Sequence, residues 1–348
     1  MSDIFAQRFK SARLKAGLSL QALADKINVP ITKQAISKYE QGKAIPDSKK
    51  MIDLAKALNV KLEYFFRPAR INIKLSDPAY RKRSSMSDKR LNAINETVRD
   101  LVERYLEAES LSDNSSSVLL PEDETRHISS FDDVEYLAEK SRELWNLGND
   151  PIESLVDVLE DNNFKVALIE GDEKFDGLSC WANDTIPIIV SKKKCLGDRQ
   201  RSNLAHELGH LLMNVEESFD EEKAAKRFSA SFLVPKDIVY KELGKHRNNL
   251  NWEELHILKH KYGMSMQQWI YRAKDLGIIS ESHARSWFIK FRQINPRKEP
   301  GDQILEEKPT RMRKIVFQEL AENIITPPKA AELLACNIQD IRNSLIGI

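Results

Sequence analysis

The segment from Leu204 to Leu212 carries the side chains of this chain that are best suited to metal chemistry. His206 and His210 are four residues apart, and Glu207 directly follows the first histidine. On a helix, residues i and i+4 share a face, so two imidazole nitrogens there can bind one Zn²⁺ at about 2.0 to 2.1 Å. Glu207 lies where its carboxylate can reach a metal-bound water rather than the metal. The spacing therefore predicts a hydrolytic zinc centre.

The residues on either side of this motif favour the metal over a chance match. The same pattern occurs in helices that simply carry surface charge and a partly buried histidine. Here the flanking residues are apolar and draw both histidines toward an interior, where an unpaired charged glutamate is costly. They are Leu204, Ala205, Leu208, Leu211 and Leu212. A bound metal would offset that cost.

A hydrolytic zinc needs a third protein ligand and one open position for water. The acidic helix that we expect from about residue 220 offers two carboxylates, those of Glu221 and Glu222. Glu222, Ala225 and Phe228 share a face by their spacing, and the small Ala225 would let this helix approach the histidine helix closely. We choose Glu222 as the third ligand and keep Glu221 as the alternative.

The first 68 residues predict an all-α domain that binds DNA. Ser19 and Thr32 are expected to cap two short helices, at 20–27 and from 33 onward, and such a pair can lay its second helix in a major groove. Residues 1–68 hold 13 Lys and Arg against 6 Asp and Glu, whereas the rest of the chain holds 41 against 47. Only the N-terminal end therefore suits a polyanion.

The second of these helices supplies the candidates for reading DNA. Glutamine suits adenine and lysine suits guanine, so the base-contacting candidates are Lys33, Gln34, Ser37 and Lys38. Three further residues are better placed for phosphate, namely Gln21, Thr32 and Lys43. The alternative is that this helix bundle is a protein-interaction module.

The remainder of the chain predicts an α+β protein that is mostly helical, with one small sheet. Short apolar runs predict strands near 165–170, 177–181 and 186–190. Helices at 252–261 and 265–276 would form a second helix-turn-helix shape, which we interpret as structural, and we find no other internal repeat. We expect four segments: a DNA-binding domain at 1–68, a basic linker and helix at 69–127, a zinc peptidase domain at 128–245 and a helical C-terminal region at 246–348 that binds a partner or substrate.

A helix expected after Ser87 carries an apolar stripe that needs a partner. The stripe runs through Leu91, Ile94, Val98, Leu101, Val102 and Tyr105. It could pair two copies of the chain into a homodimer, which would match a two-fold operator. Three well-separated cysteines and the absence of any long apolar run predict a cytoplasmic protein that does not associate with membranes.

Five stretches together resemble the ImmA/IrrE family of metallo-endopeptidases, in the form that carries an N-terminal Xre/Cro-type domain. They are KQAISKYEQG, FDGLSCW, DRQRSNLAHELGHLLM, EEKAAKRFSASFLVP and LKHKYGMSMQQWIYRAKDLGIIS. The resemblance implies a zincin-like domain with zinc ligands at His206, His210 and Glu222, and with Glu207 as the general base. Mn²⁺ is the alternative metal. Tyr262 and Arg201 are candidate oxyanion donors, and a structural role for Arg201 is an equal alternative.

The resemblance also implies what the enzyme would act on. Family members of this kind cleave helix-turn-helix repressors in phage, mobile elements or stress responses, so we expect a specific repressor or antitoxin as the protein substrate. Two alternatives remain: a transcription regulator whose peptidase-like domain senses a partner without cleaving it, and an antitoxin that neutralises a toxin by binding. Glu207 favours the enzyme, because a purely structural zinc needs no base.

Overall fold

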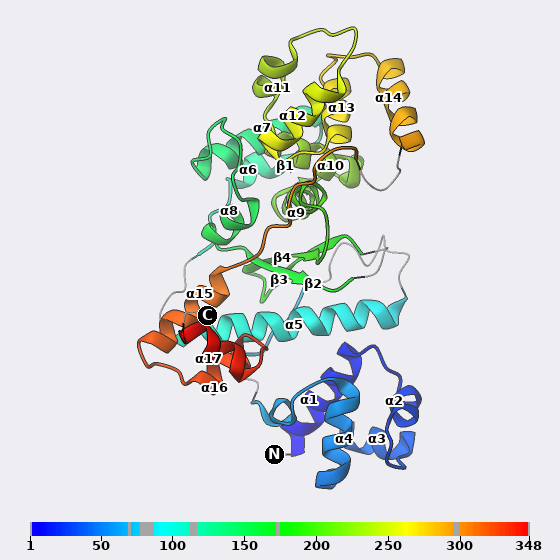
Figure 1. The fold of residues 1–348 in the computed structure, drawn as a ribbon, viewed down its shortest axis with the longest axis vertical. Helices are drawn as coiled ribbons and strands as arrows, with labels where there is room; N and C mark the ends of the chain where they lie inside the picture. Colours follow the sequence, from blue (N-terminus) through cyan, green and yellow to red (C-terminus); the bar gives the residue numbers. More distant parts are fainter. Residues whose placement is uncertain are drawn as a thin grey trace.

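The computed structural model describes residues 2–68, 71–76, 87–111, 117–171, 175–294 and 299–346. Within these ranges the protein is mostly helical, and a long central helix, α5 (Asp88–Leu111), lies between the N-terminal helices and a small sheet (Figure 1). The expected basic stretch around Arg81, Lys82 and Arg83 lies outside the described residues, as do Asp113 and Asn114 of the expected linker. The α+β class with a predominance of helix is confirmed.

The N-terminal helices fold around an aromatic core that includes Phe5, Phe9 and Phe65. Ser19 Oγ accepts a hydrogen bond from the backbone N–H of Ala22, and Thr32 caps the following helix in the same way, as predicted. These side chains satisfy backbone donors that a helix start leaves free. The elements are α1 (Ser2–Lys15), α2 (Leu20–Lys26), α3 (Lys33–Glu40), α4 (Ser48–Leu58) and the 3₁₀ helix η1 (Leu62–Phe66).

Helix α5 buries its apolar stripe inside the chain, so the prediction that this stripe pairs two copies is wrong. Ile94, Val98 and Val102 pack against the sheet and are at most 4% exposed. Further along, Tyr105 packs with the C-terminal helices. The sequence showed that the stripe needed a partner, but partners from distant parts of the same chain satisfy that need.

Buried ion pairs attach the N-terminal helices to α5. The guanidinium of Arg8 donates to Glu103 Oε2 at 2.6 Å, and that of Arg67 donates to Asp100 Oδ1 at 2.7 Å. Lys15 Nζ also reaches Asp100 Oδ2 at 2.9 Å. Burial opposes ionisation of Asp100, but the charges of Arg104, Lys15 and Arg67 outweigh it and hold the pKa of the carboxyl well below its ordinary value. The helix-turn-helix end is therefore fixed to the body by polar contacts.

The three-stranded sheet lies between α5 and the histidine helix (Figure 1). Its order is β2-β4-β3, with β2 parallel and β3 antiparallel to the central β4. Alternation of side chains sends Leu178 and Cys180 toward α5 and leaves Ser179 on the opposite face. The strands are β2 (Lys165–Ile169), β3 (Gly177–Ala182) and β4 (Ile186–Lys192), within a residue or two of the predicted runs.

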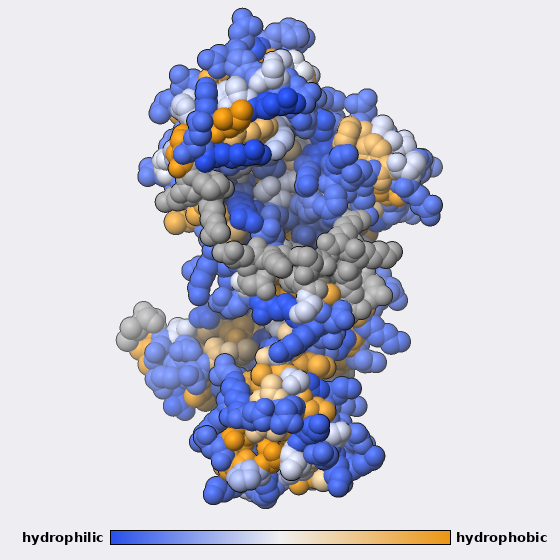
Figure 2. Space-filling model, turned by 90° about the vertical axis from the view of Figure 1, so that its right-hand side faces the viewer, coloured by the Kyte–Doolittle hydropathy of each residue, from blue (hydrophilic) through white to orange (hydrophobic). Residues whose placement is uncertain are grey.

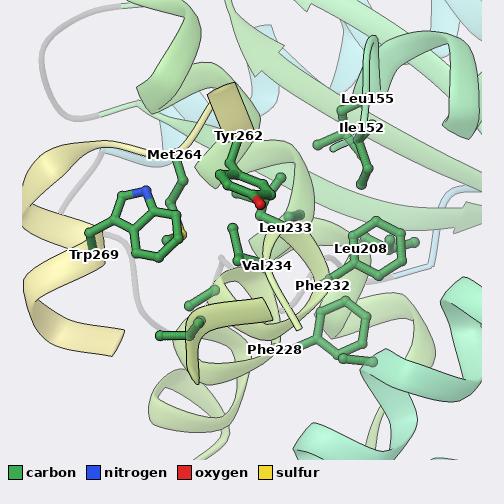
Figure 3. Packing of buried hydrophobic residues seen from close by; sticks show 14 of the residues in the cluster. Ile152, Leu155, Leu208, Phe228, Phe232, Leu233, Val234, Tyr262, Met264 and Trp269 are labelled. Carbon is green, nitrogen blue, oxygen red and sulfur yellow. The ribbon is translucent and has the colours of Figure 1, made fainter. Parts of the chain in front are cut away.

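A helical layer covers the other face of the sheet. Its core joins Leu208 of the histidine helix to Phe228 and Phe232 of the next helix and to Trp269 further on (Figure 3). The boundary expected between residues 127 and 128 falls inside this layer, because β1 (His127–Ile128) pairs with β5 (Asn214–Val215). The helices are α6 (Asp123–Arg126), α7 (Phe131–Leu144), α8 (Leu155–Asp161), α9 (Gly197–Leu212) and α10 (Glu221–Leu233).

The same core continues past the boundary expected at residue 245. Tyr262, Trp269 and Ile270 are buried together with residues of α9 and α10. The second helix-turn-helix shape is therefore packed into the body, and Arg272 on its second helix is also fully buried. The helices here are α11 (Lys236–Leu243), α12 (Trp252–Tyr262), α13 (Met266–Asp275) and α14 (Glu281–Ile294), followed near the C-terminus by α15 (Arg311–Ala321), α16 (Pro327–Leu333) and α17 (Ile338–Ile346).

The surface is mainly hydrophilic, with apolar side chains gathered on the N-terminal helices at the lower end of the molecule (Figure 2). Ile45, Ile52 and Phe66 are among the exposed large apolar residues of that region. No helix in the described ranges combines the length and the apolar character that crossing a bilayer requires.

Candidate metal centre

Helices α9 and α10 pack closely enough to bring the predicted ligands together. Gly209 lies between the two helices, and a Cβ there would be only 3.1 Å from the Phe228 ring. Ala225 on α10 is fully buried at this contact. Asp220 begins α10 by accepting a hydrogen bond from the Lys223 backbone N–H. Small residues thus set the helix separation, and the cap sets where the first turn of α10 starts.

His206, His210 and Glu222 converge on one point, with their ligand atoms all within 4.8 Å of one another. The two Nε2 atoms are 3.1 Å apart, Glu222 Oε2 lies 3.5 Å from His206 Nε2, and Glu222 Oε1 lies 3.4 Å from His210 Nε2. A tetrahedral zinc with bonds of 2.0 to 2.1 Å requires about 3.3 Å between neighbouring ligand atoms. The three separations are close to that value, with a different Glu222 oxygen facing each histidine, and the cluster is therefore compatible with a first-row divalent metal.

Glu221 takes a different role from the one considered for it. Its Oε1 lies 2.8 Å from His210 Nδ1, the ring nitrogen on the side away from His206 and Glu222. A carboxylate at Nδ1 fixes the ring orientation and leaves Nε2 with the lone pair that a metal needs. The structure therefore places Glu222 beside the Nε2 atoms of both histidines and Glu221 behind His210.

The carboxylates around His210 also favour its charged form in the absence of a metal. Burial alone would disfavour the imidazolium, but the hydrogen bonds to Glu222 and Glu221 outweigh burial and raise the pKa of His210. The His210 side chain is only 7% exposed, whereas that of His206 is 21% exposed. The half-exposed Glu222 leaves the cluster open toward solvent on one side.

The Glu207 side chain extends from α9 to the edge strand β3. Ser179 Oγ donates to Glu207 Oε2 at 2.7 Å. Gly177 makes room for this arrangement, because a Cβ at that position would lie 3.2 Å from Glu207 Cγ and 2.9 Å from the Val190 carbonyl oxygen. Burial raises the pKa of the Glu207 carboxyl, and the neighbouring histidines only partly oppose that rise. A raised pKa suits a group that must take up and release a proton.

Three parts of this site were not assigned from the sequence: Ser179, Gly177 and the position of Glu221 behind His210. Ser179 and Gly177 both lie in the stretch FDGLSCW, which was singled out only as a point of resemblance. A serine flanked by residues that must face α5 could have been placed on the α9 face by strand alternation. Its pairing with Glu207 needed the tertiary structure.

Neither residue considered as an oxyanion donor reaches the cluster. The Tyr262 hydroxyl donates to Glu242 Oε1 at 2.6 Å, and its ring belongs to the hydrophobic core (Figure 3). Arg201 is 3% exposed and binds the Ile152 carbonyl at 2.6 Å and the Glu307 carboxylate. The expected oxyanion-donor role is therefore wrong for both residues. Both have structural roles, and for Arg201 this had been the equal alternative.

The predicted DNA-contacting residues lie on the N-terminal helices, far from the metal cluster (Figure 1). Lys33, Gln34 and Lys38 are exposed on α3, while Ser37 is partly buried and accepts from Gln41 Nε2 at 3.0 Å. The remaining three are exposed as well: Thr32 caps α3, the Gln21 amide donates to Asp25 on its own helix, and Lys43 follows α3. The structure brings all seven to one end of the molecule.

Comparisons with known proteins give separate matches for the N-terminal helices and for the part of the chain that holds the metal cluster. Residues 9–65 match the helix-turn-helix family model, and residues 171–274 match the IrrE N-terminal-like domain of the peptidase M78 family. The chain combines a helix-turn-helix domain with an IrrE N-terminal-like domain. The second match includes β3, α9 and α10, and therefore every residue of the cluster described above.

One curated relative is a helix-turn-helix regulator. The chain is similar to the SPbeta prophage-derived uncharacterized HTH-type transcriptional regulator YonR of Bacillus subtilis, with 38% identity over 64 residues. That match covers 18% of this chain and 57% of the relative. The relative's description as an HTH-type regulator agrees with the helix-turn-helix family match.

The raised pKa of Glu207 predicts that this residue destabilises the metal-free fold at neutral pH. The folded state then holds the carboxyl proton more tightly than the unfolded state, so stability is lost as pH rises above the ordinary pKa. With a chelator present at pH 8, Glu207→Gln should raise the melting temperature by about 2 to 4 °C, and the difference should shrink toward pH 5. Differential scanning fluorimetry measures both values.

Glu217→Gln is the matched control, because Glu217 is exposed in the same region and should change little. A lower melting temperature for Glu207→Gln than for the wild type at pH 8 would contradict the prediction that the Glu207 carboxylate destabilises the metal-free fold.

Proposed function

We propose that this protein is a DNA-binding transcription regulator whose IrrE-like domain is a zinc metallo-endopeptidase. The observation that carries the proposal is the near-tetrahedral spacing of His206, His210 and Glu222 beside a buried carboxylate, Glu207, that is not one of the three. A structural zinc site is usually closed by a fourth protein ligand, and a catalytic one keeps a position open. The three-residue cluster among the described residues fits the second type.

Zn²⁺ is the preferred metal, and Mn²⁺ is the alternative. Two imidazole nitrogens and one carboxylate form a ligand set found in hydrolytic zinc sites. Cys180 and Cys195 are free thiols, and neither belongs to the cluster. The site therefore lacks the sulfur ligands that favour a structural zinc or an iron–sulfur centre.

When bound, the metal would supply Lewis acidity, lowering the pKa of a water molecule and polarising the scissile carbonyl. Glu207 would remove the proton from that water and deliver it to the amide nitrogen as the peptide bond breaks. Ser179 would hold the carboxylate in place through its hydrogen bond to Oε2, leaving Oε1 for the proton. Glu221 would keep the His210 ring oriented through Nδ1.

The substrate that we propose is an extended segment of a specific repressor or antitoxin. Among the described residues, strand β3 is at one side of its sheet, and Leu75 and Ser76 pair with it at Ala182 and Trp181. Gly177 and Ser179 lie at the other end, next to Glu207. An added substrate strand would use the main-chain groups at this end, a mode of peptide recognition that sheet edges commonly support.

DNA binding would be the task of the helix-turn-helix domain. Lys33, Gln34, Ser37 and Lys38 would read bases from α3, with phosphate contacts from Gln21, Thr32 and Lys43. We propose residues 1–68 as the DNA-binding domain, 69–127 as its connection and 128–245 as the part of the peptidase that holds the site. Its core continues into α12 and α13, and we propose the rest of 246–348 as a region for partners. A homodimer on a two-fold operator would need a surface other than the apolar stripe of α5.

A regulator that senses a partner without cleaving it is the second candidate function. The similarity to a transcription regulator and the firm attachment of the N-terminal helices to α5 both favour signalling to DNA. An antitoxin that acts by binding is a variant of the same idea. The position of Glu207 favours the enzyme, because neither sensing nor neutralisation needs a base at the metal.

The metal proposal predicts graded effects on affinity. The wild type should retain about one Zn²⁺ per chain after dialysis, and His206→Ala or His210→Ala should lose it. Glu222→Gln removes a ligand and should weaken binding most among the carboxylate variants, whereas Glu221→Gln should weaken it about 10- to 100-fold. Competition with a zinc-binding dye measures the dissociation constants. Equal affinities for wild type and Glu222→Gln would contradict the ligand assignment.

Cleavage decides between the enzyme and the sensor. Wild type and Glu207→Gln would be mixed with the repressor or antitoxin encoded beside this gene, at about pH 7 to 8 with added metal, and products resolved by mass spectrometry. We expect a discrete product from the wild type only, because a neutral amide cannot accept the water proton. Metal content and melting curves of both proteins check that the variant is folded and loaded.

Two other outcomes would overturn the proposal in different ways. Equal cleavage by Glu207→Gln would show that Glu207 is not the base. An absence of cleavage by either protein, together with DNA binding that responds to the neighbour-encoded partner, would establish the sensor instead.

A further inference from the structure

The last three helices form a small unit of their own at the C-terminal end. Ile315, Val316, Ala330, Leu333 and Ile341 are buried in a cluster that is separate from the main core. Helix α16 is followed by a short turn and then by α17, with four residues between them, of which Ala335 adopts a left-handed conformation at φ 50°. Two short helices joined by a turn of three to four residues are typical of a helix-turn-helix.

This pair resembles the N-terminal pair in the lengths of its helices and in one buried position on each helix. Helices α2 and α16 both have seven residues, and the fourth residue of each, Leu23 or Ala330, is 0% exposed. In α3 and α17 the fourth residue is an isoleucine, Ile36 or Ile341, and it is again 0% exposed. The correspondence was missed in the sequence because the turns differ in length and the buried residues of α16 are alanines.

The outward face of α17 carries side chains that can read DNA. Counted from the helix start, positions two, five and six are Gln34, Ser37 and Lys38 in α3, and they are Gln339, Arg342 and Asn343 in α17. The three α17 residues are exposed and share a face by i, i+3, i+4 spacing. Arginine recognises guanine, and glutamine or asparagine recognises adenine, through paired hydrogen bonds.

Local contacts keep this face ordered and limit its negative charge. Gln339 Nε2 donates to Asn343 Oδ1 at 3.1 Å, so the two amides lie together. Asp340 is the only acidic residue of α17, and its Oδ2 accepts a hydrogen bond from the Asn337 backbone N–H at the helix start. The exposed Arg313 donates to Ser344 Oγ at 2.9 Å and adds a cation beside α17.

Both helix-turn-helix units rest on the same support. Helices α1 and α15 each pack against α5, and Lys61 of the N-terminal domain donates to the Cys336 carbonyl oxygen at 2.9 Å, within the turn that precedes α17. Figure 1 shows α16 and α17 beside α5, at the end of the molecule that carries α1 to α4. The two outer helices are thus held in one body, on the side away from the metal cluster.

We propose that α17 is a second DNA-reading helix, so that one chain contacts two segments of a duplex, one through α3 and the other through α17. The proposal rests on the DNA binding proposed for the N-terminal domain. Exposed polar side chains at matching positions on two such helices would lengthen the recognised site and add specificity through base contacts.

The test uses the full-length chain with duplexes selected from a random-sequence DNA library by the wild type. The variant Gln339→Ala, Arg342→Ala, Asn343→Ala should bind the selected duplex at least about 10-fold more weakly, because it loses base contacts. Hydroxyl-radical footprinting should show loss of one protected segment while the other remains. The complementary triple variant is Lys33→Ala, Gln34→Ala, Lys38→Ala. Its footprint should lack the other protected segment.

The matched control is Ser282→Ala, Arg285→Ala, Ser286→Ala on α14, which also removes one positive charge from an exposed i, i+3, i+4 face. It should leave affinity and footprint unchanged, and melting curves should show that all variants are folded. An α17 variant with the wild-type affinity and footprint would overturn the inference. A changed oligomeric state in light scattering with an unchanged footprint would also overturn it, in favour of a protein contact.

Failure of the inference and failure of the proposed DNA binding are distinguishable. If the wild type selects no duplex from the library, the DNA-binding function itself is wrong. If the wild type selects a duplex and only the α3 variant loses binding, DNA binding stands and α17 is not part of it.

Discussion

The close packing of α9 against α10 is the constraint on which the site depends. Gly209 and Ala225 remove side-chain volume from the contact, and Phe228 fills the space that remains. Only at this separation can the carboxylate of Glu222 lie within 3.5 Å of both imidazole Nε2 atoms. A larger residue at Gly209 would move α10 away and open the ligand set, because a packed interior accommodates extra volume poorly.

The central helix α5 relates the site to the DNA-binding end. One of its faces packs against the sheet whose strand β3 supplies Ser179 to Glu207, and its acidic residues bind Arg8, Lys15 and Arg67 of the N-terminal domain. The interface is polar and charged, and breaking such buried pairs is costly. The domains are therefore joined through a shared rigid element, which gives a physical route by which events at the sheet and at DNA could influence each other.

The local features of the chain could be predicted from the sequence, whereas its tertiary partners could not. Caps at Ser19 and Thr32, the strands and the histidine helix follow from short-range patterns, and the family and fold class are confirmed. The sequence could not show which residues cover the apolar stripe of α5, because the strands that contact it lie about 70 to 90 residues away in the chain. Tyr262 and Arg201 were considered for chemistry on residue type alone, and the structure pairs the Tyr262 hydroxyl with Glu242 and the Arg201 guanidinium with Ile152 and Glu307.

We propose that His206, His210 and Glu222 hold one catalytic metal with an open position. X-ray absorption at the zinc edge of the loaded, full-length protein tests it most directly. We expect two imidazole ligands and one or two light oxygen ligands at about 2.0 to 2.2 Å, no sulfur, and the same spectrum for Glu207→Gln. A sulfur ligand, fewer than two imidazoles, or a ligand lost in Glu207→Gln would contradict it.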